Sequence, residues 1–254
     1  MDLNSPSSEP TNQRKGIYLL PNAFTTAALF AGFFAIVQGM NHQFELAAQA
    51  IFVAMVLDGL DGRVARLTHT QSTFGAEYDS LSDMVSFGVA PALVIYEWAL
   101  KGLGKYGWLA AFVYCAGTAL RLARFNTQIS VTSKRWFVGL PSPSAAALIA
   151  GMVWVIQGSY HIEGSQIAWL AWCMTLFAGL SMVSNVPFYS FKDVNVRRSV
   201  PFWAALIILL LFVVVSLDHS RVLWTFFLGY ACSGYLGYLW KMAKRSKNPP
   251  KSPS

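Results

Sequence analysis

Charged side chains are scarce in this chain of 254 residues, since Asp, Glu, Lys and Arg together make up only 12% of it. A soluble domain normally carries about 25% charged residues. Hydrophobic residues make up 55% of the chain and aromatic residues 15%. So little charge argues against a soluble protein and indicates an integral membrane protein.

Cysteine is also rare. The three cysteines, Cys115, Cys173 and Cys232, are far apart, and each lies in an apolar segment. We therefore expect small buried side chains rather than a disulfide framework or a cysteine metal site. The net charge of +7 does not indicate a nucleic-acid partner, because the basic residues are not gathered into a stripe with interleaved aromatics.

Long apolar runs, in contrast, are frequent. A membrane-spanning helix needs about 20 mostly apolar residues. The sequence predicts an all-α, polytopic membrane helix bundle with about eight transmembrane helices. The expected spans are 18–40, 45–66, 79–100, 107–128, 143–160, 166–187, 200–217 and 220–240.

The basic residues predict the orientation of these spans. With eight spans, all but three of the 19 Lys and Arg fall on the side that holds both termini. The three on the other side are Lys101, Lys105 and Arg221. Positive residues favour the cytoplasm. We therefore expect an integral protein of the plasma membrane, the inner membrane in a bacterium, with both termini cytoplasmic.

The two ends of the chain are polar. Residues 1–16 are rich in Ser and Pro, and we expect a disordered cytoplasmic N-terminus rather than a cleavable signal peptide. Residues 241–254 are basic and contain Pro, which predicts a solvated cytoplasmic tail. Between them, residues 17–240 form one transmembrane domain, with membrane lipids around it.

Acidic residues number only 12, yet four of them lie between Asp58 and Asp83. Asp58 and Asp61 are three residues apart, and Asp79 and Asp83 are four apart, so each pair shares one face of a helix. The polar stretch RVARLTHTQSTFGAEY between the pairs predicts a cytoplasmic turn. The two pairs then converge just inside the membrane, where ionisable residues are costly and are kept mainly for function.

Four carboxylates held together repel one another unless cations join them. Oxygen ligands suit Mg²⁺, Mn²⁺ or Ca²⁺ rather than zinc, and two such ions can clamp a diphosphate. Gly62 and Gly75 leave the backbone open to a phosphate or nucleotide. Arg66 supplies a permanent cation. Charged residues at helix ends in the membrane interface are the plainer alternative.

The stretch matches the pattern D-x2-D-G-x2-A-R-x8-G-x3-D-x3-D at every position. This pattern resembles the signature of the CDP-alcohol phosphatidyltransferase family. The resemblance implies a transmembrane catalytic domain that transfers a phosphatidyl group from a CDP-linked lipid to an alcohol and releases CMP. It also implies two metal ions, Mg²⁺ or Mn²⁺, at the four aspartates, with Asp83 as the base. Gly62, Ala65, Arg66 and Gly75 would line the nucleotide and diphosphate pocket, and a homodimer is expected.

Other segments resemble the phosphatidylserine synthase branch of that family, in its integral-membrane form, from about Leu20 to Arg198. The matching segments are LPNAFT, SFGVAPA, ALRLARFN and GLPSPSAA. The resemblance implies that CDP-diacylglycerol and L-serine are the substrates. Asn22 and Thr25 would contact cytidine or phosphate, although Pro21-Asn22 is also a typical helix start.

The acceptor site is expected among four residues of these segments. Arg121 or Arg124 would receive the serine carboxylate, and the other would receive lipid phosphate. Asn126 would add a hydrogen bond, and Ser142 either contacts substrate or caps a helix. The two arginines also fit the positive-inside pattern without any substrate role.

Two other functions compete with this interpretation. A phosphatidyltransferase with another acceptor, such as glycerol 3-phosphate, an inositol phosphate or choline, would share the signature. A divalent-cation transporter would explain carboxylates in the membrane but not the spacing of Gly62, Ala65, Arg66 and Gly75. Its ion site would also be expected near the bilayer midplane.

Overall fold

The computed structural model describes residues 19–68, 72–128, 136–189 and 213–247, with residues 206 and 210 as isolated positions. Its first half consists of α1 (Leu19–Met40), α2 (Phe44–Leu67), α3 (Thr73–Asp83), η1 (Met84–Val89), α4 (Ala90–Ile95), η2 (Tyr96–Leu100), η3 (Lys101–Leu103) and α5 (Lys105–Gln128). Its second half consists of β1 (Trp136–Val138), α6 (Ser142–Trp154), η4 (Val155–Tyr160), η5 (Gly164–Ile167), α7 (Ala168–Val183), β2 (Pro187–Tyr189) and α9 (His219–Lys247).

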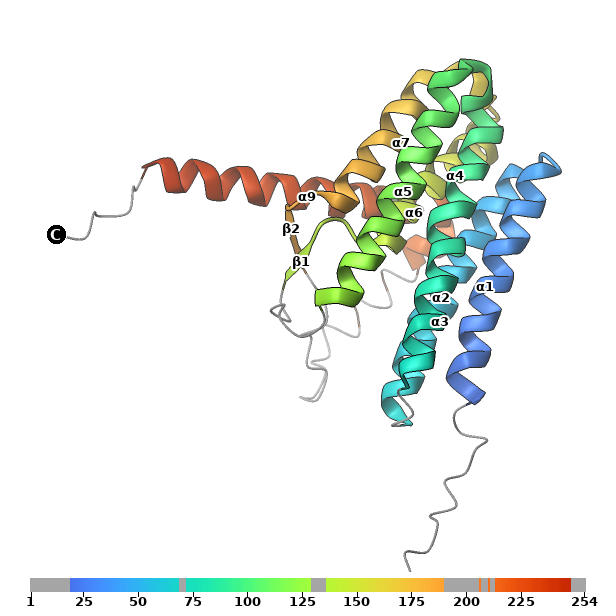
Figure 1. The fold of residues 1–254 in the computed structure, drawn as a ribbon. Coiled ribbons are helices and arrows are strands. Elements are labelled where there is room, and N and C mark those ends of the chain that lie inside the picture. The colour runs from blue at the N-terminus through green and yellow to red at the C-terminus, as the bar shows by residue number, and fades with distance from the viewer. Residues whose placement is uncertain are drawn as a thin grey trace, which may run out of the picture.

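The first half forms an up-and-down bundle of long helices. Figure 1 shows α1, α2, the continuous stretch from α3 to η2, and α5 lying side by side. The end of α2 and the start of α3 therefore meet at the same end of the bundle as the start of α1. Both aspartate pairs lie toward this end, which is what the expected pair of antiparallel helices requires.

The turn between the aspartate pairs is shorter than the sequence suggested. The whole stretch from Arg63 to Tyr78 was expected to be a turn, but α2 continues to Leu67 and α3 begins at Thr73. Ala65, Arg66 and Leu67 at the end of α2 favour a helix. Ser72 then caps α3, because its side-chain oxygen accepts a hydrogen bond from the backbone N–H of Gly75 at 3.0 Å.

Small side chains fill the contacts between helices. The buried core is dominated by alanine, for example Ala35, Ala47 and Ala54, while large residues such as Phe30 and Phe112 are exposed. Helices in a membrane associate through small residues that allow close approach, and their large apolar side chains face lipid. Gly117 of α5 and Gly179 of α7 form one such close crossing, where a Cβ on Gly117 would lie 2.6 Å from the carbonyl oxygen of Gly179.

The helix that carries Asp79 and Asp83 widens into a π-helix, η1, directly after Asp83. Two hydrogen bonds hold this segment. The hydroxyl of the fully buried Tyr114 donates to the carbonyl of Phe87 at 2.9 Å. Ser86 donates from its hydroxyl to the carbonyl of Ala28 in α1 at 3.1 Å. Widened turns of this kind occur frequently at functional sites.

A short two-stranded antiparallel ribbon is the exception to the expected all-helical fold. β1 and β2 pair with Phe137 opposite Phe188. Gly139 follows with a φ of 84°, a left-handed conformation that suits glycine. Leu140 then donates its backbone N–H to the carbonyl of Ser181 at 2.9 Å. These contacts fix the entry into α6, whose first residue is Ser142.

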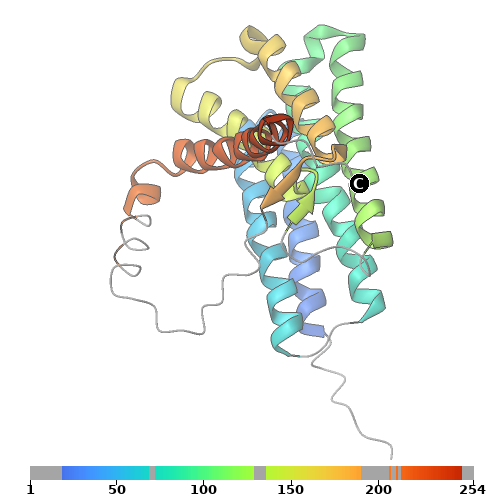
Figure 2. The same cartoon turned by 90° about the vertical axis from the view of Figure 1, so that its left-hand side faces the viewer.

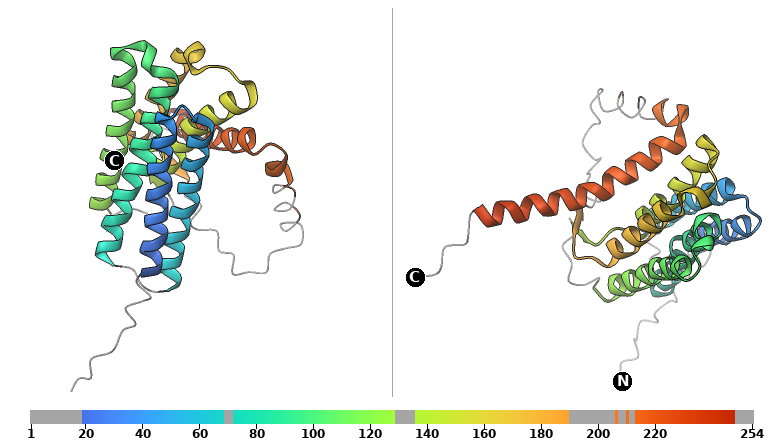
Figure 3. Two further views of the ribbon diagram at one scale, coloured as in Figure 1. Left: turned by 90° about the vertical axis from the view of Figure 1, so that its right-hand side faces the viewer. Right: turned by 90° about the horizontal axis from the view of Figure 1, so that it is seen from above.

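The helix α9 differs most from expectation. It continues past Trp240, the expected end of the last span, to Lys247. Figure 1 shows it running crosswise to the long helices, and Figures 2 and 3 agree. The right-hand view of Figure 3 shows its C-terminal half projecting beyond the bundle. The described side chains from Leu236 onward are exposed, including that of Trp240. Tyr235 still packs on the bundle, where its hydroxyl is hydrogen-bonded to that of Ser181 at 2.6 Å.

The expected spans otherwise correspond to helices within a few residues, except 200–217, which lies largely outside the described residues. Four described helical stretches are long and apolar enough to cross a membrane: Pro21–Met40, Thr73–Leu103, Gly164–Val183 and His219–Trp240. The count of eight spans therefore stays a prediction. The start of α5, near Lys101 and Lys105, lies at the opposite end of the bundle from the end of α2 (Figure 1), which contains Arg63 and Arg66. This separation agrees with the charge pattern.

Candidate metal and substrate site

The four aspartates converge between α2 and α3. Asp58, Asp61 and Asp79 each place one carboxylate oxygen within 4.8 Å of the others. Asp83 lies close enough to Asp58 and Asp79 for the three carboxyl groups to interact electrostatically. The tertiary structure thus assembles the cluster that the helical spacing predicted, from two residues on each helix.

The cluster fits a divalent cation. Asp61 is only 5% exposed, and Oδ1 of Asp79 is buried without a hydrogen-bond partner among the described residues. A buried carboxylate oxygen without a partner is costly unless something positive binds it. The ligand set consists of oxygen alone, which suits hard ions such as Mg²⁺ or Mn²⁺.

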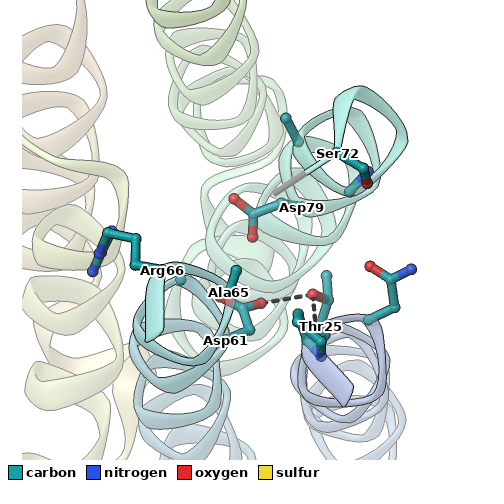
Figure 4. Close-up of a pocket in the computed structure, with 11 residues that line it drawn as sticks. Thr25, Asp61, Ala65, Arg66, Ser72 and Asp79 are labelled. Carbon is teal, nitrogen blue, oxygen red and sulfur yellow. Dashed lines mark hydrogen bonds between the residues drawn. The ribbon is translucent and has the colours of Figure 1, made fainter. Parts of the chain in front are cut away.

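A cavity of about 240 Å³ lies directly beside the cluster. Figure 4 shows Asp61 and Asp79 facing one another across it, with Thr25 next to Asp61. All six residues expected to bind the CDP-linked lipid line this cavity: Asn22, Thr25, Gly62, Ala65, Arg66 and Gly75. Residues more than 50 positions apart in the sequence therefore surround one space at the metal cluster.

The glycines and the arginine of the motif shape this cavity. A Cβ on Gly75 would lie 3.1 Å from the hydroxyl of Ser72 and 3.5 Å from the side-chain oxygen of Asn22. A larger residue at Gly75 would therefore narrow the cavity where α3 faces α1. Arg66 is exposed at the rim, and Figure 4 shows its guanidinium group extending away from the Thr25–Asp61 pair.

Three further residues line the cavity that the motif did not single out: Pro21, Ser72 and Ala76. Ser72 had a signal in the sequence, because a serine before a helical segment is a typical N-cap. Pro21 precedes Asn22 in the expected helix start. For Ala76 there was no signal, since a small residue one position after Gly75 is unremarkable.

Arg121 and Ser142 form a second polar group. Nη1 of Arg121 donates a hydrogen bond to the hydroxyl of Ser142 at 3.0 Å. The guanidinium is close enough to Asp83 for their charges to interact. Its Nε is buried and has no hydrogen-bond partner among the described residues. The pair thus approaches the aspartate cluster at Asp83, whereas neither residue lines the 240 Å³ cavity.

The other two residues expected at the acceptor site have protein partners elsewhere. Nη2 of Arg124 donates to the side-chain oxygen of Asn185 at 2.9 Å. The side-chain amide of Asn126 donates to the hydroxyl of Ser80 at 3.1 Å. Asn126 therefore braces α5 against α3 beside Asp79, and Arg124 ties α5 to the segment after α7.

Tyr230 of α9 also belongs to the surroundings of Arg121, with which it interacts electrostatically. Sequence reasoning did not find Tyr230, Asn185 or Ser80. They lie on segments remote from Arg121 and Arg124, and only tertiary packing brings them close.

Comparison with known proteins identifies the fold. A family model described as CDP-alcohol phosphatidyltransferase matches residues 18–180. A CDP-diacylglycerol–serine O-phosphatidyltransferase of Helicobacter pylori is 35% identical over 239 residues, covering 93% of this chain and 98% of the relative. The protein of that name from Mycobacterium leprae is 33% identical over 236 residues, covering 89% of this chain and 77% of the relative.

A third relative of the same name, from Methanocaldococcus jannaschii, is 38% identical over 143 residues, covering 56% of this chain and 63% of the relative. The family model spans both aspartate pairs, the cavity and Arg121. Divalent metals are used generally in this family, in agreement with the acidic cluster. The chain is an integral membrane protein of the CDP-alcohol phosphatidyltransferase family.

Proposed function

We propose that this protein transfers the phosphatidyl group of CDP-diacylglycerol to the hydroxyl of L-serine, giving phosphatidylserine and CMP. The observation that carries this proposal is the position of the four aspartates, which lie between the cavity and the Arg121–Ser142 pair. Relatives that cover most of the chain bear the name of this activity. The protein is accordingly a transferase of phospholipid biosynthesis.

Two divalent ions, Mg²⁺ or Mn²⁺, would be held by the aspartates. Asp58, Asp61 and Asp79 are close enough to share one ion, and the proximity of Asp58 to Asp83 supports a neighbouring second site. When bound, such ions neutralise charge on the diphosphate and on the departing CMP. The buried, unpartnered oxygen of Asp79 supports this assignment.

The donor lipid is expected in the 240 Å³ cavity. Gly62 and Gly75 let the diphosphate approach the helix backbones, and Arg66 at the rim supplies a cation for phosphate oxygens. The cavity is lined by residues from the start of α1, the end of α2 and the start of α3, which lie at one end of the bundle. The acyl chains can therefore remain in the lipid leaflet while the nucleotide reaches the aspartates.

The acceptor is expected at Arg121, which favours serine. A guanidinium group matches a carboxylate well, and Nε of Arg121 has no competing protein partner among the described residues. Asp83 is near enough to interact with Arg121, so a serine bound there presents its hydroxyl to Asp83. Asp83 takes the hydroxyl proton, the serine oxygen bonds to phosphorus, and the bond from phosphorus to CMP breaks.

Arg124 is less suited to bind a second anion, because it is bonded to Asn185. A phosphate-bearing acceptor such as glycerol 3-phosphate would call for a denser basic pocket than Arg121 provides. The bond between Arg124 and Asn185 therefore favours serine over the phosphate-bearing acceptors.

The topology and assembly are part of the same proposal. The distribution of basic residues favours a cytoplasmic position for both termini and the active site, where serine and CMP are soluble. A homodimer is implied by the family resemblance. The mostly exposed C-terminal half of α9 offers apolar surface that either lipid or a second copy can cover.

The test is CMP release by the purified protein in detergent, with CDP-diacylglycerol and Mg²⁺ or Mn²⁺, with and without L-serine. We expect release that depends on serine, phosphatidylserine as product, and complete loss on chelation of the metal. Glycerol 3-phosphate, inositol phosphate and choline are run in parallel, and release only with one of these would overturn the serine assignment.

Two matched variants separate the metal site from general charge effects. Asp61→Asn is expected to abolish turnover and Mn²⁺ binding. Asp218→Asn removes an aspartate that pairs with Arg221 at the start of α9, and it is expected to keep both. Metal flux into proteoliposomes without CMP release would instead support a cation transporter.

A further inference from the structure

Thr25 makes a direct contact with a residue of the metal cluster. Its Oγ1 donates a hydrogen bond to Oδ2 of Asp61 at 2.7 Å, and both side chains are buried. Figure 4 shows this bond as a dashed line at the wall of the cavity. The sequence had suggested that Thr25 contacts cytidine or phosphate, whereas its hydroxyl points to a carboxylate.

The single hydroxyl proton of Thr25 has two acceptors within reach. The second is the carbonyl of Pro21, one turn earlier in α1, at 3.2 Å. The carboxylate of Asp61 is both nearer and charged, and hydrogen bonds to charged acceptors are about twice as strong as neutral ones. The proton therefore goes to Asp61, and the rotation of that carboxylate is restricted.

The position of Thr25 is also fixed by α3, the helix that carries Asp79 and Asp83. The hydroxyl of Ser82 donates to the carbonyl of Thr25 at 3.2 Å, and Ser82 stands directly before Asp83. Thr25 on α1 thus joins α2 at Asp61 to α3 at Ser82. The bond from Ser82 is made to the backbone, so a change in the Thr25 side chain keeps it and removes only the contact with Asp61.

We propose that Thr25 is a positioning residue that orients the Asp61 carboxylate for metal binding, rather than a nucleotide contact. Partners that hydrogen-bond to metal ligands fix the ligand orientation, and their loss typically costs roughly 10–100-fold in metal affinity. This inference rests on the proposed role of Asp61 as a metal ligand. It predicts that loss of the Thr25 hydroxyl weakens metal binding and does not change the affinity for the donor lipid.

The experiment measures Mn²⁺ binding directly, by electron paramagnetic resonance of the purified full chain in detergent without nucleotide. Thr25→Val is expected to weaken Mn²⁺ binding by roughly 10–100-fold. Thr25→Ser, which keeps the hydroxyl, is expected to restore it. The KM for CDP-diacylglycerol at saturating Mn²⁺ is expected to match the unmodified protein in both variants.

Thr175→Val is the matched control. Thr175 is also a buried threonine in a helix, and its hydroxyl donates only one turn back, to the carbonyl of Ala171 at 2.7 Å. We expect its Mn²⁺ affinity to be that of the unmodified protein. An equal loss in Thr175→Val would show a general effect of losing a buried hydroxyl and would overturn the inference.

Three other results would also count against it. These are unchanged Mn²⁺ affinity in Thr25→Val, failure of Thr25→Ser to restore binding, and a raised KM for CDP-diacylglycerol with unchanged metal binding. Asp61→Asn separates this inference from the proposed function. If Asp61→Asn binds Mn²⁺ normally, the metal site itself is wrong; if it loses Mn²⁺ while Thr25→Val does not, only the role of Thr25 is wrong.

Discussion

Arg121 donates a hydrogen bond from Nη1 to the hydroxyl of Ser142 at 3.0 Å, across the junction of α5 and α6. This contact holds one edge of the guanidinium group, while the buried Nε has no protein partner among the described residues. Arg124, one turn further along α5, is bonded to Asn185 instead. The two arginines of the ALRLARFN segment are therefore not equivalent.

Arg121→Lys is expected to raise the KM for serine by about tenfold or more, because a lysine cannot offer two parallel N–H groups to a carboxylate. The KM for CDP-diacylglycerol should change little. Steady-state kinetics with each substrate varied in turn measures both constants. Arg124→Lys is the matched control, and a larger effect on serine there would reverse the assignment of the two arginines.

Ser142→Ala removes the side-chain partner of Arg121 Nη1. A net hydrogen bond is worth about 0.5–1.5 kcal/mol, so we expect the KM for serine to rise by about 2–10-fold. Ser144→Ala changes another buried serine in the first turn of α6 and serves as the comparison. Equal kinetics in the two variants would mean that Ser142 acts only at the helix start.

Tyr114→Phe removes the hydroxyl that donates to the carbonyl of Phe87 inside η1. Because this site is fully buried, water cannot replace the lost partner, and we expect a loss of about 1–3 kcal/mol in the free energy of unfolding. Thermal unfolding in detergent measures it. Tyr106→Phe changes an exposed tyrosine of the same helix and should leave the unfolding temperature unaltered.

Tyr114→Phe also tests how η1 positions Asp83, which directly precedes it. If the widened turn sets the direction of Asp83, kcat falls while the KM for CDP-diacylglycerol is kept. A stability loss without any change in kcat would confine Tyr114 to a structural role.

Gly117→Ala places a methyl group 2.6 Å from the backbone oxygen of Gly179, so α5 and α7 must move apart. We expect a destabilisation of about 1–3 kcal/mol, as is typical of overpacking. Gly237→Ala is the control, because a Cβ there meets nothing within 4 Å and alanine favours a helix. A neutral Gly117→Ala would show that the crossing can relax at no cost.

Much of the site could be predicted from the sequence because its chemistry is local. Asp58 and Asp61, like Asp79 and Asp83, share a helix face through spacing alone, and two helices joined by a short turn must lie together. The six residues expected at the donor lipid also line one cavity. Their roles in binding remain proposals.

The acceptor site shows where local reasoning ends. Arg121, Arg124, Asn126 and Ser142 were expected to act together, since three of them lie within one segment. The structure pairs Arg121 with Ser142, whereas Arg124 is bonded to Asn185 and Asn126 to Ser80. Partners such as Asn185 are about 60 residues away in the sequence. The helical periodicity of the sequence does not predict contacts at such separations.

The sequence by itself determined the membrane-embedded helical class and the four-aspartate motif, because low charge, apolar runs and helical spacing are properties of the chain alone. Only the tertiary structure decided that Thr25 turns to Asp61, that Arg121 rather than Arg124 approaches Asp83, and that α9 runs crosswise to the bundle. These outcomes depend on how small residues let helices approach and on which buried polar groups must find partners. Helix approach and polar partners both depend on contacts between segments that are distant in the sequence.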